Sequence, residues 1–444
     1  MNRKEFLYKS GVVYAGLMFL PAFLNSCKKE TLFQDLDYDG KVIIIGAGAA
    51  GMYAGYVLKS KGIDFSILEA SSKLGGRLKK IESFADFPID LGAEWLHGNN
   101  SILSDLATQS VAGPWNDDSK TKYWFSNQLI TKLPRNIAKE IESGSPADIS
   151  IKAYAEQLGF GAEYNQILEN LAGDVGTSAS RLSASEVIRE SDKWICGGAN
   201  YKFKSTFYDF INDNIAAKVK DNIEFNTVVS KIDYSSDKVI LYDKSGKSFK
   251  ADKVIISVPI TILKDGDIKF TPSLPNEKTE AFGKIGMDFG MKVYMKFSSK
   301  FYDDNISGGS LCAAYADEAY KRSSKNAILL GFVMGEQAEY LSNLGNDTAI
   351  INALLGELDS MYNGQATAKF VDAVVQDWGK EPYIRGAYSY SSIGIGNARN
   401  IAAQSVDSKL FFAGEALNTN GHFQTVHGAV ETGYREVVNI LNSI

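Results

Sequence analysis

Three glycines near the start of the chain have the spacing of a loop that binds phosphates. In VIIIGAGAAG, residues 42–51, a run of β-branched residues leads into the pattern G-x-G-x-x-G. The first glycine lets the chain turn, the second lets the backbone approach a pyrophosphate, and the third lets the next helix pack closely on the strand. We expect that helix over residues 49–60, with its first amide groups facing the phosphates. The residues expected at this site are Gly46, Gly48, Ala49, Ala50 and Gly51.

An acidic residue stands where the ribose of a dinucleotide is expected. Glu69, followed by Ala70, closes the second hydrophobic strand, eighteen residues after Gly51. A carboxylate at this place accepts hydrogen bonds from a ribose diol. Because strand, tight turn, helix and strand follow one another, residues 41–70 predict a parallel βαβ unit that binds a dinucleotide.

Length and composition indicate a globular protein of two domains that acts on small molecules. The 444 residues exceed what one hydrophobic core comfortably holds. A content of 45% hydrophobic and 23% charged residues is ordinary for a soluble protein. The formal net charge of -6 disfavours nucleic acid as a partner and weakly favours cationic small molecules. The oligomeric state stays open at this point.

Residues 1–27 have the pattern of an export signal. Arg3 and Lys4 precede an apolar run, residues 11–24, which is short for a membrane-spanning helix and ends in LNSC. LNSC resembles a bacterial lipobox, in which Cys27 would become the lipid-bearing first residue of the mature chain. We therefore expect an exported lipoprotein, periplasmic or in the cell envelope, attached to the membrane by lipid on Cys27. An uncleaved membrane anchor is the alternative, and the Sec and twin-arginine routes both stay open.

The cysteines and histidines show no metal-binding spacing. Beyond the leader only Cys196 and Cys312 remain, without a C-x-x-C motif, and whether they pair stays open. The three histidines, His97, His422 and His427, are not spaced so as to converge with carboxylates, and we expect no metal ion. No combination of Ser, His and Asp has the spacing of a nucleophile elbow, which argues against a hydrolase.

The segment SSKLGGRL, directly after the acidic strand, resembles the second fingerprint of the flavin-containing amine oxidase family. In that family the arginine contacts the cofactor's phosphates and the glycines let the chain run along the flavin. The resemblance therefore implies FAD rather than NAD. DLGAEWLHG, residues 90–98, is similar to the segment that lines the flavin ring in polyamine oxidases. The two segments add Gly75, Gly76, Arg77, Leu91, Gly92, Ala93, Glu94 and Trp95 to the expected cofactor site.

Two later segments extend the resemblance over most of the chain. NTVVSKI followed by ADKVIISVP is similar to the family's third cofactor region, in which the backbone of Val229 would meet the adenine. LFFAGEALNTNGHFQTVHGAVETGYREVVNIL resembles the closing strand and helix. The resemblance puts Gly414 and Glu415 near the ribityl-phosphate, and Thr425 and Val426 at the pyrimidine edge of the flavin. A helix beginning near Thr425 points its positive end at a locus where reduced flavin carries negative charge.

Lys292, in GMKVYMKF, is the residue whose two interpretations differ most. Met291 and Val293 alternate with Lys292 and Tyr294, which predicts a half-buried strand with the lysine on its solvated face. The family resemblance implies the opposite, because there a lysine on a sheet strand hydrogen-bonds through a water to flavin N5. We therefore expect Lys292 to position a water for the reaction of reduced flavin with oxygen.

Aromatic residues are expected over the face of the flavin. The resemblance implies a cage that holds a neutral amine and excludes water. Tyr388 matches one wall, and the other wall falls on His422 or Phe423. Trp378 fits a core tryptophan as well as a cofactor contact. His97 matches a histidine that helps orient the substrate in polyamine oxidases, and it fits a merely hydrogen-bonding loop residue equally well.

The predicted fold class is α/β, with a Rossmann-like FAD-binding domain interleaved with a substrate domain of mixed sheet and helices. The cofactor domain is expected from residues 38–98, 215–270 and 395–444, and the substrate domain from 99–214 and 271–394.

Two local signals fall inside the substrate domain. Residues 122–131 predict a β-hairpin around Ser126 and Asn127. SASE, residues 183–186, is a capping box that opens a helix.

The expected function is that of an FAD-dependent amine oxidase. A primary or secondary amine, by resemblance a polyamine-like one, would give a hydride to FAD, form an imine and then an aldehyde, and O2 would become H2O2. Ala387 stands where monoamine oxidases carry the cysteine that links the flavin, so the FAD is expected to be non-covalent. The alternatives are an L-amino-acid oxidase, with Arg385 for the carboxylate, an FAD-dependent desaturase or porphyrinogen oxidase, and an amine-binding surface lipoprotein without turnover.

Overall fold

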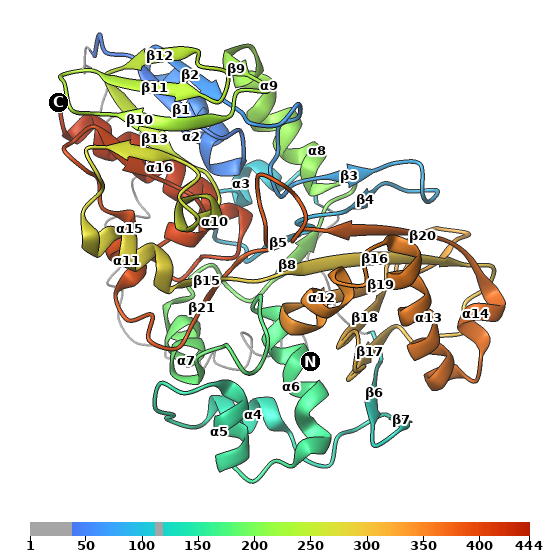
Figure 1. The fold of residues 1–444 in the computed structure, drawn as a ribbon. Coiled ribbons are helices and arrows are strands. Elements are labelled where there is room, and N and C mark those ends of the chain that lie inside the picture. The colour runs from blue at the N-terminus through green and yellow to red at the C-terminus, as the bar shows by residue number, and fades with distance from the viewer. Residues whose placement is uncertain (1–37, 112–118) are drawn as a thin grey trace.

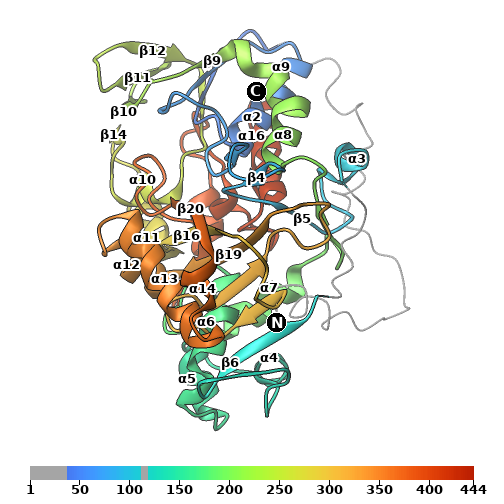
Figure 2. The same ribbon diagram turned by 90° about the vertical axis from the view of Figure 1, so that its right-hand side faces the viewer.

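The computed structural model describes residues 38–111 and 119–444 and contains two large sheets whose strands come from interleaved parts of the chain (Figures 1 and 2). The leader expected over residues 1–27, with Cys27, lies outside the described residues. Within the described ranges, no helix combines the length and the apolar character that crossing a bilayer requires.

The first sheet has five strands in the order β22-β13-β1-β2-β9, and all its neighbours pair in parallel. Strand β1 is buried on both faces, with Val42 and Ile44 in one core and Ile43 and Ile45 in another. This double burial explains its unbroken run of β-branched residues. The strands are β1 (Val42–Ile45), β2 (Phe65–Leu68), β9 (Ile223–Glu224), β13 (Lys253–Ile256) and β22 (Leu410–Phe412).

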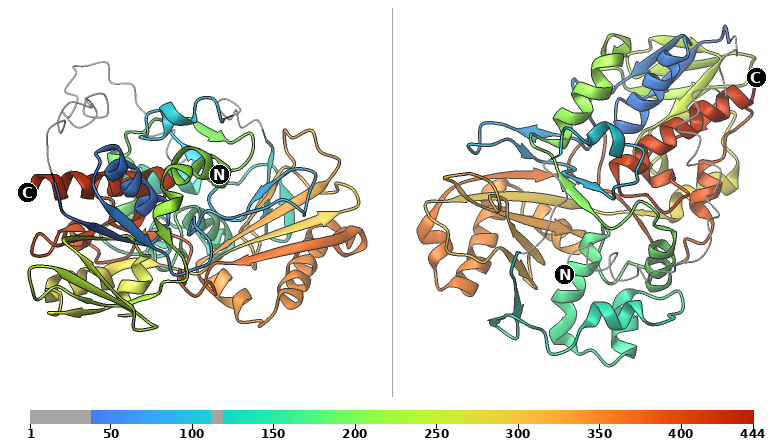
Figure 3. Two further views of the ribbon diagram at one scale, coloured as in Figure 1. Left: turned by 90° about the horizontal axis from the view of Figure 1, so that it is seen from above. Right: turned by 180° about the vertical axis from the view of Figure 1, so that it is seen from behind.

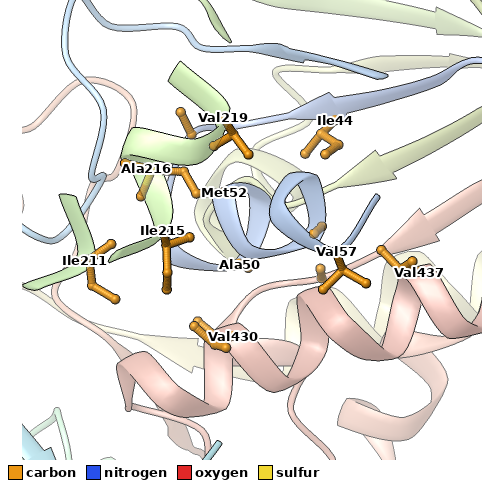
Figure 4. Close-up of a cluster of buried hydrophobic side chains, with 14 of the residues drawn as sticks. Ile44, Ala50, Met52, Val57, Ile211, Ile215, Ala216, Val219, Val430 and Val437 are labelled. Atoms are coloured by element: carbon orange, nitrogen blue, oxygen red, sulfur yellow. The ribbon is translucent and has the colours of Figure 1, made fainter. Parts of the chain in front are cut away.

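Two helices from opposite ends of the chain cover one face of this sheet side by side (Figure 3). They approach closely at Gly433, where a Cβ atom would stand 2.2 Å from the carbonyl oxygen of Ala50. Figure 4 shows Val430 and Val437 of the C-terminal helix packed with Val57 of the first helix in one apolar cluster. The helices on this side are α2 (Ala49–Ser60), α3 (Ser104–Ala107), α8 (Phe207–Ile211), α9 (Ala217–Val219) and α16 (Val426–Asn442).

A four-stranded sheet and three helices share the core on the opposite face of the parallel sheet. The strand order is β12-β11-β10-β14, and Ile232 and Leu241 point from it into this core. The elements are β10 (Val229–Asp233), β11 (Val239–Asp243), β12 (Ser248–Ala251), β14 (Lys269–Thr271), α10 (Ile260–Lys264), α11 (Asn276–Lys284) and α15 (Ala398–Ala403).

The second large sheet has seven strands in the order β20-β16-β19-β18-β17-β6-β7. It is mixed, because β17 and β6 pair in parallel while all other neighbouring strands of the sheet pair antiparallel. Helices α12, α13 and α14 cover one face (Figures 1 and 2). The elements are β6 (Thr121–Phe125), β7 (Gln128–Ile130), β16 (Gly290–Phe297), β17 (Asn305–Ser307), β18 (Ala314–Asp317), β19 (Ala327–Met334), β20 (Phe370–Asp377), α12 (Gly335–Ser342), α13 (Asp347–Tyr362) and α14 (Gln365–Lys369).

Short elements connect these layers. A helical segment follows the hairpin β6–β7 and ends in α7, which is capped by Ser183 accepting a hydrogen bond from the Glu186 amide, as the capping box predicted. The hairpin is also confirmed, with φ of 50° and 61° at Ser126 and Asn127. The elements are α4 (Ile137–Glu142), α5 (Ile151–Gln157), α6 (Asn165–Asp174), α7 (Ala184–Lys193), β3 (Lys80–Ile81), β4 (Ile89–Asp90), β5 (Trp95–His97), β8 (Asn200–Lys202), β15 (Ile285–Met287) and β21 (Ser389–Ser391).

The predicted fold class is confirmed. A parallel Rossmann-like sheet interleaves with a mixed sheet and helices. The residue bounds between the two domains stay a prediction. One strand differs from its pattern: β16 is not half-buried, because Met291 and Val293 face the helices α12–α14 while Tyr294 on its other face packs with Phe84 and Leu91.

Candidate active site

One cavity of about 1440 Å³ reaches from the glycine loop after β1 to strand β16 of the mixed sheet. It exceeds the roughly 300–1,000 Å³ of an ordinary small-molecule pocket. Gly46 and Gly48 line one part of it, and Lys292 and Tyr388 line another. The cavity is therefore large enough for a dinucleotide together with a small substrate.

The glycine loop fits a pyrophosphate. Helix α2 begins at the N-cap Gly48 without a side-chain cap and with no acidic residue in its own first turn. A Cβ atom on Gly48 would meet no protein atom within 4 Å and would project into the cavity. Gly46 has φ of +104°, which the turn requires. An anion at this helix terminus would face free donors and the positive end of the helix dipole.

Gly51 does not line the cavity, although the sequence put it in the cofactor site. A Cβ atom there would stand 2.0 Å from the carbonyl oxygen of Gly46 and 2.7 Å from the Ser257 hydroxyl. Its role is the close packing of helix on strand. Leu91 is also outside the cavity lining, because its side chain is buried beside Tyr294 while its carbonyl oxygen accepts from the indole nitrogen of Trp378 at 3.1 Å.

Glu69 lines the cavity at the end of β2 and shapes the loop around it. Its Oε2 accepts a hydrogen bond of 2.7 Å from the Ala47 amide, and its Oε1 accepts from the amide and hydroxyl of Ser71 at 2.9 and 2.8 Å. The carboxylate thus holds the glycine loop against the turn after β2. Ala70, beside it, also lines the cavity.

Arg77 and the buried Glu415 form a partly buried ion pair that joins distant segments at the cavity wall. Arg77 Nη1 stands 2.8 Å from Glu415 Oε1 and donates to the Ala387 carbonyl oxygen at 2.9 Å. Glu415 also accepts from the amides of Ser389 and Gln424. Burial alone would raise the pKa of Glu415, but Arg77 and these donors bring it below its ordinary value.

Lys292 projects from β16 into the cavity and is only 6% exposed. Its Nζ stands 2.5 Å from Glu94 Oε2 and donates to the Asp90 carbonyl oxygen at 3.2 Å. The alternating pattern of the strand alone predicted that Lys292 faces solvent. That prediction is wrong, because the β3–β4 segment covers this face of the sheet. The buried position agrees with what the family resemblance implied for Lys292.

Glu94 belongs to a longer row of buried charges. Lys202 Nζ lies 3.3 Å from Glu94 Oε1 and 3.2 Å from Glu318 Oε2, and Arg322 pairs with the other Glu318 oxygen. Burial opposes ionisation of Glu94, yet Lys202 and Lys292 hold its pKa well below the ordinary value. Asp90, in contrast, is buried enough that its pKa rises to about 7.

Three of the predicted aromatic and histidine positions line the cavity. Trp378 is 5% exposed and is therefore both a core residue and a cavity residue. Tyr388 donates its hydroxyl hydrogen to the Gly173 carbonyl oxygen at 3.0 Å, which fixes its ring. His97 Nδ1 lies 2.9 Å from Asn200 Oδ1, its partner in the β5–β8 pair.

The second aromatic wall, predicted at His422 or Phe423, is not at the cavity. His422 turns toward Glu431, and Phe423 lies under the Arg399 guanidinium, 3.8 Å from ring centroid to carbon. The adjacent residues Gln424 and Thr425 line the cavity instead. Gln424 has φ of +67°, and this local turn carries the two preceding side chains away.

The cavity brings together most of the predicted site residues, although the role of each stays a prediction. Those that line it are Gly46, Gly48, Ala49, Ala50, Glu69, Ala70, Gly75, Gly76, Arg77, Gly92, Ala93, Glu94, Trp95, His97, Val229, Lys292, Trp378, Tyr388, Gly414, Glu415, Thr425 and Val426. Sequence reasoning missed Lys202 and Glu318, which have no motif around them, and Gln424, which lies in the C-terminal segment next to the residues chosen there.

The two histidines near α16 do converge with a cysteine, contrary to the expectation from their spacing. Ligand atoms of Cys196, His422 and His427 all lie within 4.8 Å of one another, and all three residues are buried. Neither Cys196 nor Cys312 forms a disulfide.

Comparison with known proteins agrees with this architecture. Residues 205–441 match the family described as flavin containing amine oxidoreductase, and residues 44–109 match an NAD(P)-binding Rossmann-like domain. Lysine-specific histone demethylase 2 of Homo sapiens is 26% identical over 98% of this chain and 57% of that protein. Lysine-specific histone demethylase 1 homolog 1 of Arabidopsis thaliana is 28% identical over 90% of this chain and 52% of that protein. The chain thus spans about half the length of these curated relatives.

Two solved structures share the fold. Putrescine oxidase bound to putrescine has a TM-score of 0.76 at 19% identity, and cyclohexylamine oxidase from Brevibacterium oxydans has 0.75 at 19%. Each comparison covers 91% of this chain and 99% of the other. Because the family match spans more than half of the chain and its cavity combines a dinucleotide loop with a buried lysine, the chain belongs to the flavin-containing amine oxidoreductases, with FAD as its cofactor.

Proposed function

We propose that this protein oxidises a primary or secondary amine, with a polyamine-like substrate favoured and O2 as the electron acceptor that becomes H2O2. The observation that carries the proposal is that Lys292 and Tyr388 line the same cavity as the glycine loop and Arg77. An FAD held by the loop and the arginine would have the lysine and the tyrosine within the same enclosed volume.

Bound FAD supplies the acceptor for a hydride from the α-carbon of the amine. The protein itself would position the substrate and exclude water from it. Tyr388 is held by its hydrogen bond to Gly173, so its ring offers a fixed apolar surface for the substrate. Lys292 is held by Glu94 and by the Asp90 carbonyl, and its remaining hydrogen can hold a water at a constant place. The N-terminus of α16, capped by Thr425, adds positive potential at the cavity wall.

The end of helix α6 at the cavity would favour a substrate with a second ammonium group. Asp174 is the last residue of α6 and lines the cavity close to Tyr388, whose hydroxyl reaches the Gly173 and Asp174 carbonyls. A helix C-terminus ending in a carboxylate gives that region negative potential, which attracts a distal cation.

An N-methylated lysine side chain is the second candidate substrate, because the curated relatives are lysine-specific histone demethylases. Oxidation of such a secondary amine needs the same cofactor and the same buried lysine. An L-amino-acid substrate is disfavoured, since the Arg385 guanidinium is already held by Asp265 and Asp267 at 3.1 and 2.9 Å.

The test is a peroxide assay on the FAD-loaded protein with spermidine, putrescine, simple monoamines, a methylated lysine peptide and L-amino acids. We expect the highest kcat/KM with the di- and polyamines, and monoamines of equal chain length serve as the matched control. An anaerobic arm follows loss of the yellow flavin colour on adding the amine. Bleaching without peroxide in air would overturn O2 as the acceptor, and an absence of bleaching by every amine would favour the amine-binding lipoprotein.

The location is a second part of the proposal. Residues 1–27 support export and lipid attachment at Cys27 through their basic, apolar and LNSC segments. Full-length protein expressed in a bacterial host should sediment with membranes, and Cys27→Ala should move it to the soluble fraction. An unchanged distribution of the Cys27→Ala variant would refute lipid attachment at this cysteine.

A further inference from the structure

Three buried side chains with lone pairs for a metal meet beside the N-terminus of α16. Cys196 comes from the loop between α7 and β8, His422 from the segment before α16, and His427 from the first turn of α16 itself. Cys196 Sγ lies 3.4 Å from His422 Nε2 and 3.6 Å from His427 Nε2. The three residues are 1%, 3% and 1% exposed.

These separations are those of ligands on one metal ion. Zn²⁺ binds a thiolate sulfur at about 2.3 Å and an imidazole nitrogen at about 2.0–2.1 Å, and a tetrahedral angle then puts sulfur and nitrogen roughly 3.5 Å apart. Both measured sulfur–nitrogen distances agree with that value.

A carboxylate orients one of the two histidines for this role. His422 Nδ1 lies 2.9 Å from both carboxylate oxygens of Glu431. Nε2 of His422 is the ring nitrogen nearer the Cys196 sulfur, at 3.4 Å against 3.7 Å for Nδ1. Asn418 donates to Glu431 Oε2 at 2.9 Å and so holds the carboxylate in place. A carboxylate behind a metal-binding histidine is the usual outer partner of such a ligand.

Two imidazole nitrogens face the same sulfur atom. The Trp194 ring stands edge-on to both imidazoles, with centroids 5.3 and 5.6 Å away.

We propose that Cys196, His422 and His427 bind one transition-metal ion, Zn²⁺ or copper, with Glu431 as the positioning residue of His422 and with water in the fourth position. Thiolate and imidazole are the ligands that these ions share. On binding, the Cys196 S–H bond breaks, a sulfur–metal bond forms and the proton leaves to solvent, without any change in oxidation state. The ion would tie the loop before β8 to the first turn of α16, next to Thr425 and Val426 of the cavity wall.

The first experiment measures metal content in the tag-free, FAD-loaded protein by inductively coupled plasma mass spectrometry. We expect about one equivalent of Zn²⁺ or copper per chain, and its loss in Cys196→Ser and His422→Asn. Cys312→Ser is the matched control, because Cys312 is also buried yet lies in the core of the mixed sheet, and it should retain the ion. Glu431→Gln should bind the ion about 10–100-fold more weakly.

A second experiment identifies the ion and keeps the proposal open to refutation where Cys196→Ser does not fold. Chelator-stripped wild type and Glu431→Gln are titrated separately with Zn²⁺, Cu²⁺ and Co²⁺, with retained FAD as the measure of folding. Co²⁺ in this ligand set gives absorption bands at wavelengths beyond those of the flavin, and copper bound to a thiolate gives a visible band that Zn²⁺ lacks. The proposal is overturned if folded wild type binds no more of any ion than folded Cys196→Ser, or if Glu431→Gln binds as tightly as wild type.

Discussion

Replacing Lys292 by methionine separates a structural from a catalytic role of the buried lysine. Methionine matches the lysine side chain as far as Cε and so keeps most of its packing in β16, but it lacks the ammonium 2.5 Å from Glu94. Breaking a buried ion pair by removing one partner costs about 3–5 kcal/mol of unfolding free energy. Because Glu94 keeps Lys202 at 3.3 Å, we expect a loss near the lower end, about 3 kcal/mol.

The double variant Lys292→Met/Glu94→Gln tests that magnitude. It leaves no uncompensated carboxylate, and Lys202 keeps Glu318 at 3.2 Å, so it should recover about 2 kcal/mol of the loss measured by urea unfolding. If the lysine acts in proton movement through a water, reoxidation of the reduced flavin by O2 should fall about 10²-fold in both variants. Stopped-flow absorbance at full FAD occupancy measures this rate. A wild-type rate in either variant would refute a role of Lys292 in the reaction, whatever happens to stability.

Three further predictions concern the cofactor and pH. Gly48→Ala should fold but retain less FAD, because the added Cβ points into the cavity. Gly51→Ala should instead lower the melting temperature, since the added Cβ would stand 2.0 Å from the Gly46 carbonyl oxygen. Equal FAD content and equal melting temperature in the two variants would contradict this prediction. Burial raises the pKa of Asp90 to about 7, so between pH ~4 and 7 the native state keeps a proton that the unfolded chain has lost. The resulting stabilisation is complete below pH ~4 and disappears as the pH rises through 7, and it amounts to at most ~4 kcal/mol of unfolding free energy measured in urea. Asp90→Asn should remove this dependence of the unfolding free energy on pH. Because Ala387 replaces the linking cysteine of monoamine oxidases, acid precipitation should release all flavin into the supernatant, and flavin that stays with the pellet would show a covalent bond.

Much of the cofactor half could be predicted from sequence because its signals are local. The glycine loop, helix α2 and the acidic end of β2 follow one another within one βαβ unit, and helix α2 spans the expected residues 49–60. The strand β16 shows the limit of such signals. The alternation of apolar and polar residues in β16 predicted one solvent-exposed face. Phe84 and Leu91 from the β3–β4 segment cover that face, and nothing in the pattern of residues 290–297 predicts this covering.

The charged row beside Lys292 could not be predicted for a related reason. Glu94 and Lys292 are 198 positions apart in the chain, and Lys202 belongs to a strand of three residues with no recognisable motif. Only the pairing of β5 with β8 brings Lys202 opposite Trp95 and hence beside Glu94. Pairing between distant short strands depends on the finished fold, so composition and spacing cannot reveal it.

The same reasoning shows why spacing could not exclude a metal-binding cluster. Spacing rules apply to ligands that lie within one short motif, whereas Cys196 and His422 are 226 positions apart. His427 is placed by the start of α16, which Thr425 caps at the cavity wall, so the geometry that serves the cofactor also fixes this imidazole. The Cys196 side chain therefore meets an imidazole whose position is fixed by the start of α16. The turn is therefore a place where two neighbouring histidines and a distant cysteine can reach ligand geometry without any recognised sequence motif.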